Sequence, residues 1–125
     1  MTGHSILIVD DDDLLCDMVA ALLEIEGYRV TLAHDGVAGF ALLEQVRFDL
    51  ILLDLVMPRM DGLQFMRKLH EERPGHPPIV VMSASVSAQI VEEGRGYGVA
   101  GMIKKPVQPQ HLVDTVRTAI AARGG

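Results

Sequence analysis

The sequence predicts an α/β fold in which a parallel sheet is covered by helices on both faces. Three apolar runs, at residues 6–9, 50–53 and 79–82, consist entirely of Ile, Leu, Val and Met. Short continuous apolar runs bounded by turn residues are typical of strands that are buried on both faces. Segments with helical apolar spacing separate these runs, and this alternation favours βα units joined by crossover helices.

The first half of the chain predicts two helices around an edge strand. Residues 29–32 alternate polar and apolar side chains, as a half-buried edge strand does. Before this strand, Gly27 suits the position after the last turn of a helix. The apolar residues of that first helix repeat at i, i+3, i+4, i+7 and i+8: Leu15, Met18, Val19, Leu22 and Leu23. After Asp35 and Gly36, the spacing of Ala38, Ala41 and Leu42 predicts a second helix.

The second half predicts three more helices and a brief fifth strand at 101–104. Pro and Gly in 57–62 predict a loop, and a third helix follows with an apolar face at 65, 66 and 69. A fourth helix is predicted within 83–98. Because Gly94, Gly96 and Gly98 each cost about 1 kcal/mol relative to Ala inside a helix, we expect it to be short or mobile. The closing helix has its apolar face at 112, 116, 119 and 120.

Five strand–helix units predict a (βα)5 doubly wound, flavodoxin-like three-layer sandwich. Right-handed crossovers suit the strand order 2-1-3-4-5, which places the first and third strands side by side. We expect residues 1–125 to form a single domain, with 1–5 and 123–125 as flexible ends.

Composition narrows the possible functions. The formal net charge of −6 opposes direct binding to nucleic acid or to anionic lipid, since both attract excess Lys and Arg. The single cysteine, Cys16, falls within the first helical pattern, where we expect a small buried thiol, compatible with a reducing compartment. No apolar run approaches the about 18 residues of a membrane helix, and we expect a cytoplasmic protein.

Acidic residues follow two of the predicted central strands. Asp10 and Asp11 follow the first strand, Asp54 follows the third, and Lys105 follows the fifth. Because ligands of open parallel sheets bind outside the carboxyl ends of the strands, these side chains should meet in one crevice. Two carboxylates about 5 Å apart repel by roughly 3 kcal/mol at an effective dielectric near 20, so the crevice favours a hard cation. Mg²⁺ is the expected occupant, and Mn²⁺ could replace it.

Four segments in this order resemble the receiver domain of two-component response regulators, of the chemotaxis-Y type, over almost the whole chain. They are ILIVDD at 6–11, LDLVMPRMDG at 53–62, MSA at 82–84 and KKP at 104–106. The resemblance implies a phosphorelay protein in which Asp54 accepts a phosphoryl group from a phosphohistidine on a sensor kinase or phosphotransfer protein. It further implies a signalling phosphoacceptor with slow self-dephosphorylation and no separate enzyme activity. Its output would reach a downstream protein or an effector domain.

The same resemblance implies a role for each matching position. Asp11 would bind Mg²⁺ directly, Asp10 would bind it through water, and Val56 would supply a backbone carbonyl alongside the acceptor Asp54. Lys105 would neutralise phosphoryl charge, with a cis bond to Pro106 aiming its ammonium inward.

A second group of positions would carry the switch. Ser83 stands where the family has Thr or Ser, and its hydroxyl would move toward the phosphoryl oxygen. Ser83 could equally cap the fourth helix, as could Ser85 or Ser87. Met102 departs from the family, which often has Tyr or Phe there.

Two other interpretations compete with a phosphoacceptor. Asp10 and Asp12 satisfy the Asp-x-Asp pattern of haloacid dehalogenase-like Mg²⁺ phosphatases, with Asp10 as nucleophile and Ser83 and Lys105 resembling later motifs. Phosphatases of that family are longer chains with a cap and a further acidic motif after the lysine. Asp54 would have no role in such an enzyme. A receiver-like binding module without phosphorylation would usually have lost an acidic residue or the lysine, and this chain retains them all.

Overall fold

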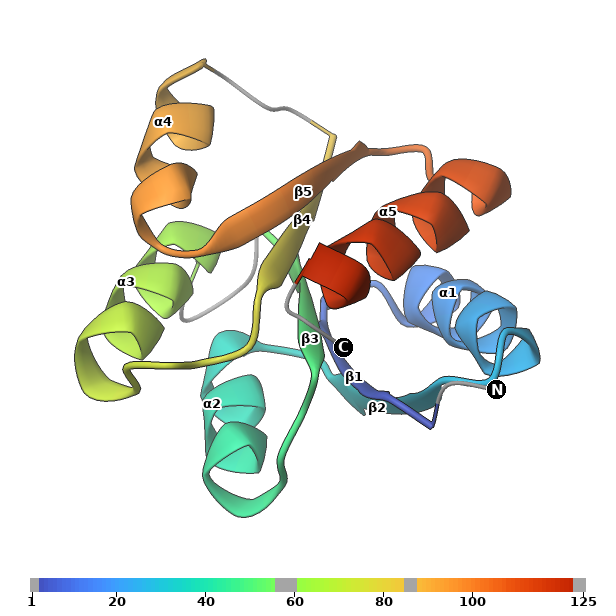
Figure 1. Ribbon diagram of the computed structural model, residues 1–125, viewed down its shortest axis with the longest axis horizontal. Helices are drawn as coiled ribbons and strands as arrows, with labels where there is room; N and C mark the ends of the chain where they lie inside the picture. The colour runs from blue at the N-terminus through green and yellow to red at the C-terminus, as the bar shows by residue number, and fades with distance from the viewer. Residues whose placement is uncertain (1–2, 56–60, 85–87, 123–125) are drawn as a thin grey trace.

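The computed structural model describes residues 3–55, 61–84 and 88–122, which form five strands and five helices in strict alternation (Figure 1). In chain order these elements are β1 (Ser5–Val9), α1 (Asp13–Ile25), β2 (Arg29–Ala33), α2 (Gly36–Gln45), β3 (Leu50–Asp54), α3 (Gly62–Glu72), β4 (Ile79–Ser83), α4 (Ala88–Gly96), β5 (Val99–Lys104) and α5 (Pro109–Ala122). None of the helices in these ranges has the length and apolar character needed to span a bilayer.

The strands form one parallel sheet in the order β2-β1-β3-β4-β5, as predicted. β1 and β3 pair in register, with Ile6 opposite Leu50 and Val9 opposite Leu53. The central strands β3 and β4 are buried along their whole length, which explains their continuous apolar sequences. β2 is an edge strand with an exposed Arg29, in agreement with its alternating pattern.

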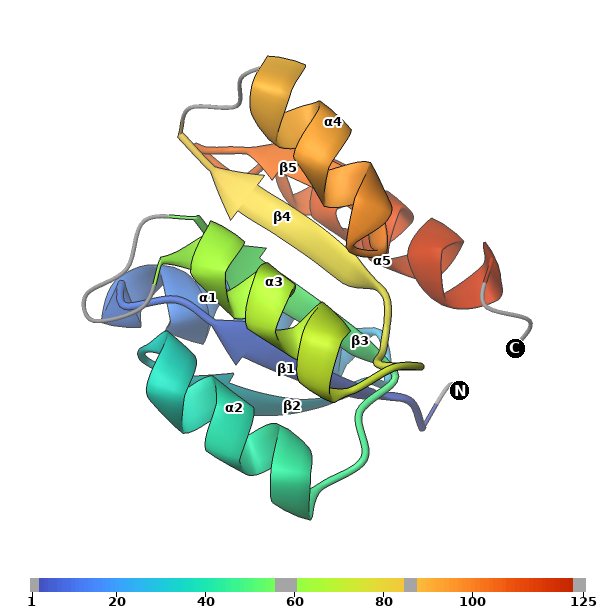
Figure 2. The ribbon, with the colours of Figure 1, turned by 90° about the vertical axis from the view of Figure 1, so that its left-hand side faces the viewer.

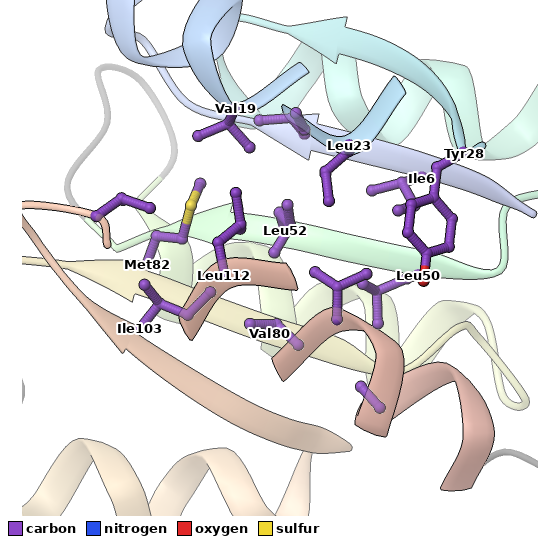
Figure 3. Close-up of a cluster of buried hydrophobic side chains, with 14 of the residues drawn as sticks. Ile6, Val19, Leu23, Tyr28, Leu50, Leu52, Val80, Met82, Ile103 and Leu112 are labelled. Carbon is purple, nitrogen blue, oxygen red and sulfur yellow. The ribbon is translucent and has the colours of Figure 1, made fainter. Parts of the chain in front are cut away.

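Helices cover both faces of the sheet, and each face has its own apolar cluster. α1 and α5 pack on one face, where Ile6, Leu50 and Val80 form one cluster with Val19 and Leu112 (Figure 3). α2 and α3 lie side by side on the opposite face, where α4 also lies (Figure 2). The predicted three-layer sandwich is therefore confirmed, because alternate residues of each central strand join opposite clusters.

Side chains at the helix ends fix where the helices begin. Asp12 caps α1 by accepting a hydrogen bond from the Leu15 amide at 3.1 Å, and Asp35 caps α2 through the Ala38 amide at 2.7 Å. Asp61 and Gln64 form a reciprocal capping box at the start of α3. Aspartate at these positions also suits the positive end of the helix dipole.

The second predicted helix is present as α2, which packs on the sheet through small residues. Ala38 and Ala41 are exposed and Leu42 is partly buried against the core, while the buried residues of α2 are Gly36, Gly39 and Phe40. A Cβ atom on Gly39 would lie 2.9 Å from the Cγ2 atom of Val9, so the absent side chain allows a close approach of α2 to β1. Glycine carries no apolar signal, so the hydrophobic pattern could not reveal this close approach.

Two boundaries also differ from the prediction. Ser5, expected within a flexible end, is the first residue of β1, because its amide donates to Asp49 Oδ2 at 2.8 Å and its carbonyl accepts from the Asp49 amide at 2.7 Å. β5 begins at Val99, two residues before the predicted strand. α4 has nine residues, so the expectation of a short helix is confirmed.

The glycines of α4 provide a matched pair of substitutions. A Cβ on buried Gly94 would lie 2.9 Å from Val99 Cγ2, whereas a Cβ on exposed Gly96 would meet no atom within 4 Å. We expect Gly94→Ala to lower the free energy of unfolding by about 1–3 kcal/mol through overpacking. Gly96→Ala should raise it by about 0.5 kcal/mol, since alanine favours the helix. Urea denaturation followed by circular dichroism tests both, and equal effects of the two changes would contradict this packing.

Candidate phosphorylation and metal site

The parallel register brings the acidic residues together at one edge of the sheet. Val9 of β1 lies opposite Leu53 of β3, and Asp10 and Asp54 are the next residues after these two, so they lie side by side. One carboxylate oxygen from each of Asp10, Asp11 and Asp54 lies within 4.8 Å of the others. Among the described residues, these three side chains lie close enough together to hold a metal ion. The predicted convergence of the three aspartates is confirmed.

Burial makes this acidic cluster unusual. Asp10 is 0% exposed and Asp54 is 5% exposed, while Asp11 faces solvent. Buried carboxylates require a cation or hydrogen-bond donors, because burial removes the water that would otherwise solvate their charge. Asp11 leaves one side of the cluster open, so an ion and its remaining water ligands could enter there.

Lys105 supplies positive charge at this cluster. Its Nζ lies 3.0 Å from Asp10 Oδ2 and 3.5 Å from Asp54 Oδ1, and its side chain is 21% exposed. Burial opposes the ammonium charge, but the hydrogen bond to Asp10 and the charges of Asp10 and Asp54 outweigh it, raising the pKa of Lys105 above its ordinary value. Lys105 therefore remains charged between the two buried carboxylates at neutral pH.

The backbone holds Lys105 in place. Its amide donates to the carbonyl of Ser83 at 2.9 Å, which ties it to the end of β4. The Lys105–Pro106 bond is cis, as the family resemblance implied, whereas neighbouring Lys104 is exposed. The pair of adjacent lysines thus divides into one inward and one outward side chain.

Three contacts fix the position of Asp10. Its amide donates to the Ala33 carbonyl at 3.0 Å, and its Oδ1 accepts from the Asp12 amide at 2.9 Å. The Sγ of buried Cys16 lies 3.3 Å from the Asp10 carbonyl and donates to it. Burial and the nearby carboxylates, Asp10 first, raise the pKa of Cys16 to about 12, so the thiol stays protonated. Cys16 was predicted only as a buried thiol, and its bond to Asp10 follows from the turn between β1 and α1.

Gly62 is a site residue whose role the sequence pattern did not reveal. Its amide donates to the Leu55 carbonyl at 2.9 Å, and a Cβ there would lie 2.7 Å from the carbonyl oxygen of Asp54. The sequence showed Gly62 only as a loop residue before a helix. In the fold, the start of α3 rests directly against the backbone of Asp54.

Ser83 lies at the buried end of β4 and is 2% exposed. It is opposite Lys104 in β5, next to the residue that aims at the carboxylates. The described part of α4 begins at Ala88. Ser85, Ser87 and Val56 lie outside the described residues.

Met102, at the position where the family often has Tyr or Phe, has a packing role. Met102, in the middle of β5, is partly buried against the cluster that includes Phe65 and Val81. Tyr97, which precedes β5, packs on the same cluster, and its ring lies 5.6 Å from that of His70 in an edge-to-face arrangement. Tyr97 therefore has the packing role that was expected for it.

We expect Lys105→Gln to lower the free energy of unfolding by about 1–3 kcal/mol in metal-free buffer, because Asp10 would lose a buried charged partner. Since folding raises the pKa of Lys105, its stabilisation is complete below the ordinary lysine pKa and is lost as pH rises through the raised value. The stability difference between wild type and variant should thus be constant near neutral pH and shrink at strongly alkaline pH. Lys104→Gln is the matched control, and an equal loss in that variant would contradict the role of Lys105.

The sequence also resembles known proteins. It is 35% identical over 116 residues to the DNA-binding dual master transcriptional regulator RpaA of Synechocystis, covering 92% of this chain and 48% of that protein. It is 35% identical over 115 residues to the DNA-binding response regulator MtrA of Mycobacterium tuberculosis, covering 92% and 50% of the two chains. The chain thus spans about half the length of these curated relatives.

Solved structures match over nearly the whole chain. The CheY-like receiver domain protein of Methanospirillum hungatei superposes with a TM-score of 0.89 at 31% identity, covering 98% of this chain and 97% of the other. Chemotaxis protein CheY4 of Vibrio cholerae superposes with a TM-score of 0.87 at 30% identity, covering 94% and 99%. Residues 6–117 match the family described as the response regulator receiver domain. This chain, with its strand-end aspartates and inward lysine, belongs to the response regulator receiver domain family.

Proposed function

We propose that Asp54 is the residue that accepts a phosphoryl group in this receiver domain. The observation that carries the proposal is the shared crevice of Asp10, Asp11, Asp54 and Lys105. Asp54 is the last residue of the central strand β3, and Gly62, the first residue of α3, packs against its backbone carbonyl. Both carboxylate oxygens of Asp10 have partners within the chain, Oδ1 the Asp12 amide and Oδ2 the Lys105 ammonium.

Mg²⁺ fits the donor set of this site. The three carboxylates offer hard oxygen atoms within 4.8 Å of one another, and the exposed Asp11 leaves room for water ligands. We assign Asp10, Asp11 and Asp54 to the ion, with the Val56 carbonyl as a further ligand, and Mn²⁺ as an alternative occupant. When bound, Mg²⁺ supplies positive charge that offsets repulsion between the carboxylates and an incoming phosphoryl group.

The chain's own residues would then carry out the transfer. A carboxylate oxygen of Asp54 forms the new bond to phosphorus while the bond from phosphorus to the donor histidine nitrogen breaks. The Lys105 ammonium, already 3.5 Å from Asp54 Oδ1, is positioned to neutralise the phosphoryl oxygens. The product is an acyl phosphate on Asp54, which water hydrolyses slowly, so the chain acts as a switch.

Ser83 and Lys105 link the acceptor to the rest of the fold. Both lie beside the carboxyl edge of β4 and β5, and the Ser83 carbonyl holds the Lys105 amide. A Ser83 hydroxyl drawn toward the phosphoryl group would move the segment from Ala84 to Gly98, which includes α4. The α4–β5–α5 surface would then bind a downstream protein or an effector domain, consistent with relatives named as transcriptional regulators.

The partner that delivers the phosphoryl group is a sensor histidine kinase or a phosphotransfer protein, and α1 offers it a surface. Leu14 is 82% exposed and Ile25 is 80% exposed. Met18, which the sequence pattern grouped with the buried residues of this helix, is 40% exposed. Positions 14, 18 and 25 share one face of a helix, since successive residues turn by about 100°. This apolar stripe starts beside the acidic site, where a helix that carries the donor histidine would dock.

The acceptor assignment is tested with acetyl phosphate and Mg²⁺. Intact-mass measurement should show one added phosphoryl group that hydroxylamine removes, and Asp54→Asn should abolish it. Asp12→Asn is the matched control, because asparagine also caps a helix and Asp12 lies outside the carboxylate cluster. Lys105→Gln should slow the reaction about 10²-fold through loss of charge stabilisation. Persistence of the hydroxylamine-sensitive group in Asp54→Asn would overturn the assignment.

The docking stripe is tested by comparing a protein donor with a small one. Leu14→Glu should reduce transfer from a histidine-phosphorylated kinase that labels the wild-type chain by at least about tenfold, since a buried charge would disrupt an apolar contact. Its reaction with acetyl phosphate should not change. Ala41→Glu, on the exposed side of α2, is the control. Equal loss with both donors would place the defect in the site and would contradict a docking role.

A further inference from the structure

Cys16 joins the first turn of α1 to the loop that carries two of the three clustered aspartates. The side chain is buried, and it packs in the apolar cluster that also contains Val19. Its Sγ lies 3.3 Å from the carbonyl oxygen of Asp10, to which the thiol donates a hydrogen bond. The thiol therefore has a polar partner in the loop as well as apolar neighbours in the core.

The Asp10 carbonyl belongs to the peptide unit that joins Asp10 to Asp11. A peptide unit is planar, so the direction of its carbonyl also sets how the chain continues on both sides of it. Two of the three carboxylates in the cluster are attached at the two ends of this one unit. A rotation of the unit would therefore change the distance between the two carboxylates.

The carbonyl depends on Cys16 for its hydrogen bond. Among the described residues, the other hydrogen bonds of Asp10 use its amide and its two carboxylate oxygens, and the thiol is the donor to its carbonyl. Asp10 is fully buried, so bulk water cannot replace a missing donor. Because a buried carbonyl without a donor is unfavourable, loss of the thiol would favour a different orientation of the peptide unit.

A small apolar filler is the alternative role for a buried cysteine. Val19 provides the comparison, since it lies one turn later on the same buried face of α1 and belongs to the same cluster. Valine has no hydrogen to donate, so it contributes packing alone. Cys16 and Val19 thus separate the effect of packing under α1 from the effect of the bond to Asp10.

We propose that Cys16 is a positioning residue for the metal site. Its thiol holds the peptide unit between Asp10 and Asp11 in the orientation that lets both carboxylates reach one ion. Cys16 acts through Asp10 and does not touch the ion, which takes oxygen ligands. This inference rests on the metal assignment made under the proposed function, and it adds a residue of α1 that determines the affinity.

Titration with Mn²⁺, followed by the electron paramagnetic resonance signal of the free ion, tests the proposal. Cys16→Ala should raise the Kd about tenfold, at the lower end of the effects of residues that orient metal ligands. Cys16→Ser keeps a donor and should stay within about threefold of wild type. Val19→Ala, the matched control, removes two methyl groups from the same cluster and should change the Kd by less than about twofold.

NMR of the metal-free chain supplies a readout that does not depend on the ion. The carbonyl ¹³C resonance of Asp10 and the amide ¹⁵N resonance of Asp11 both report on a hydrogen bond to this carbonyl. Both should shift in Cys16→Ala and return toward their wild-type positions in Cys16→Ser. In Val19→Ala they should stay close to wild type, even though that change also weakens packing beneath α1.

The two measurements distinguish failure of this inference from failure of the metal assignment. A wild-type Kd in Cys16→Ala, or equal losses in Cys16→Ala and Val19→Ala, would overturn the positioning role alone. A wild-type chain that does not bind Mn²⁺ would overturn the metal assignment together with this inference. Unchanged Asp10 and Asp11 resonances in metal-free Cys16→Ala would show that the thiol does not hold the peptide unit.

Discussion

The structure depends on holding three carboxylates together that repel one another. The parallel pairing of β1 with β3 places Asp10 and Asp54 side by side, and both are nearly inaccessible to water. The fold offsets this repulsion with one ammonium, one amide donor to Asp10 and an open side at Asp11. The site keeps an excess of negative charge, which a divalent cation would neutralise. With the cation bound, the positive charge of the ion and of Lys105 would favour a phosphoryl group.

Most of the fold and the central site could be predicted from sequence because the signals were strong and local. The buried strands are continuous apolar runs, and the helices α1, α3 and α5 have clear apolar faces. Residues that directly follow a parallel strand must appear at one edge of the sheet. For that reason Asp10, Asp11, Asp54 and Lys105 could be brought together before any coordinates were known.

Features that depend on the absence of a side chain, or on contacts between distant loops, could not be predicted. Gly39 and Gly62 matter because a Cβ atom would not fit, and no pattern of hydrophobicity records this. The Cys16 bond to the Asp10 carbonyl depends on the precise path of a turn.

The close fit of Gly62 against the Asp54 carbonyl joins α3 directly to the strand that carries the acceptor. A Cβ at position 62 would lie 2.7 Å from that oxygen, so a larger residue would have to push α3 away from β3. On its other side, Asp54 lies opposite Met82 of β4 in the sheet. The backbone of the acceptor is therefore confined from two sides, by a missing side chain and by a strand pairing.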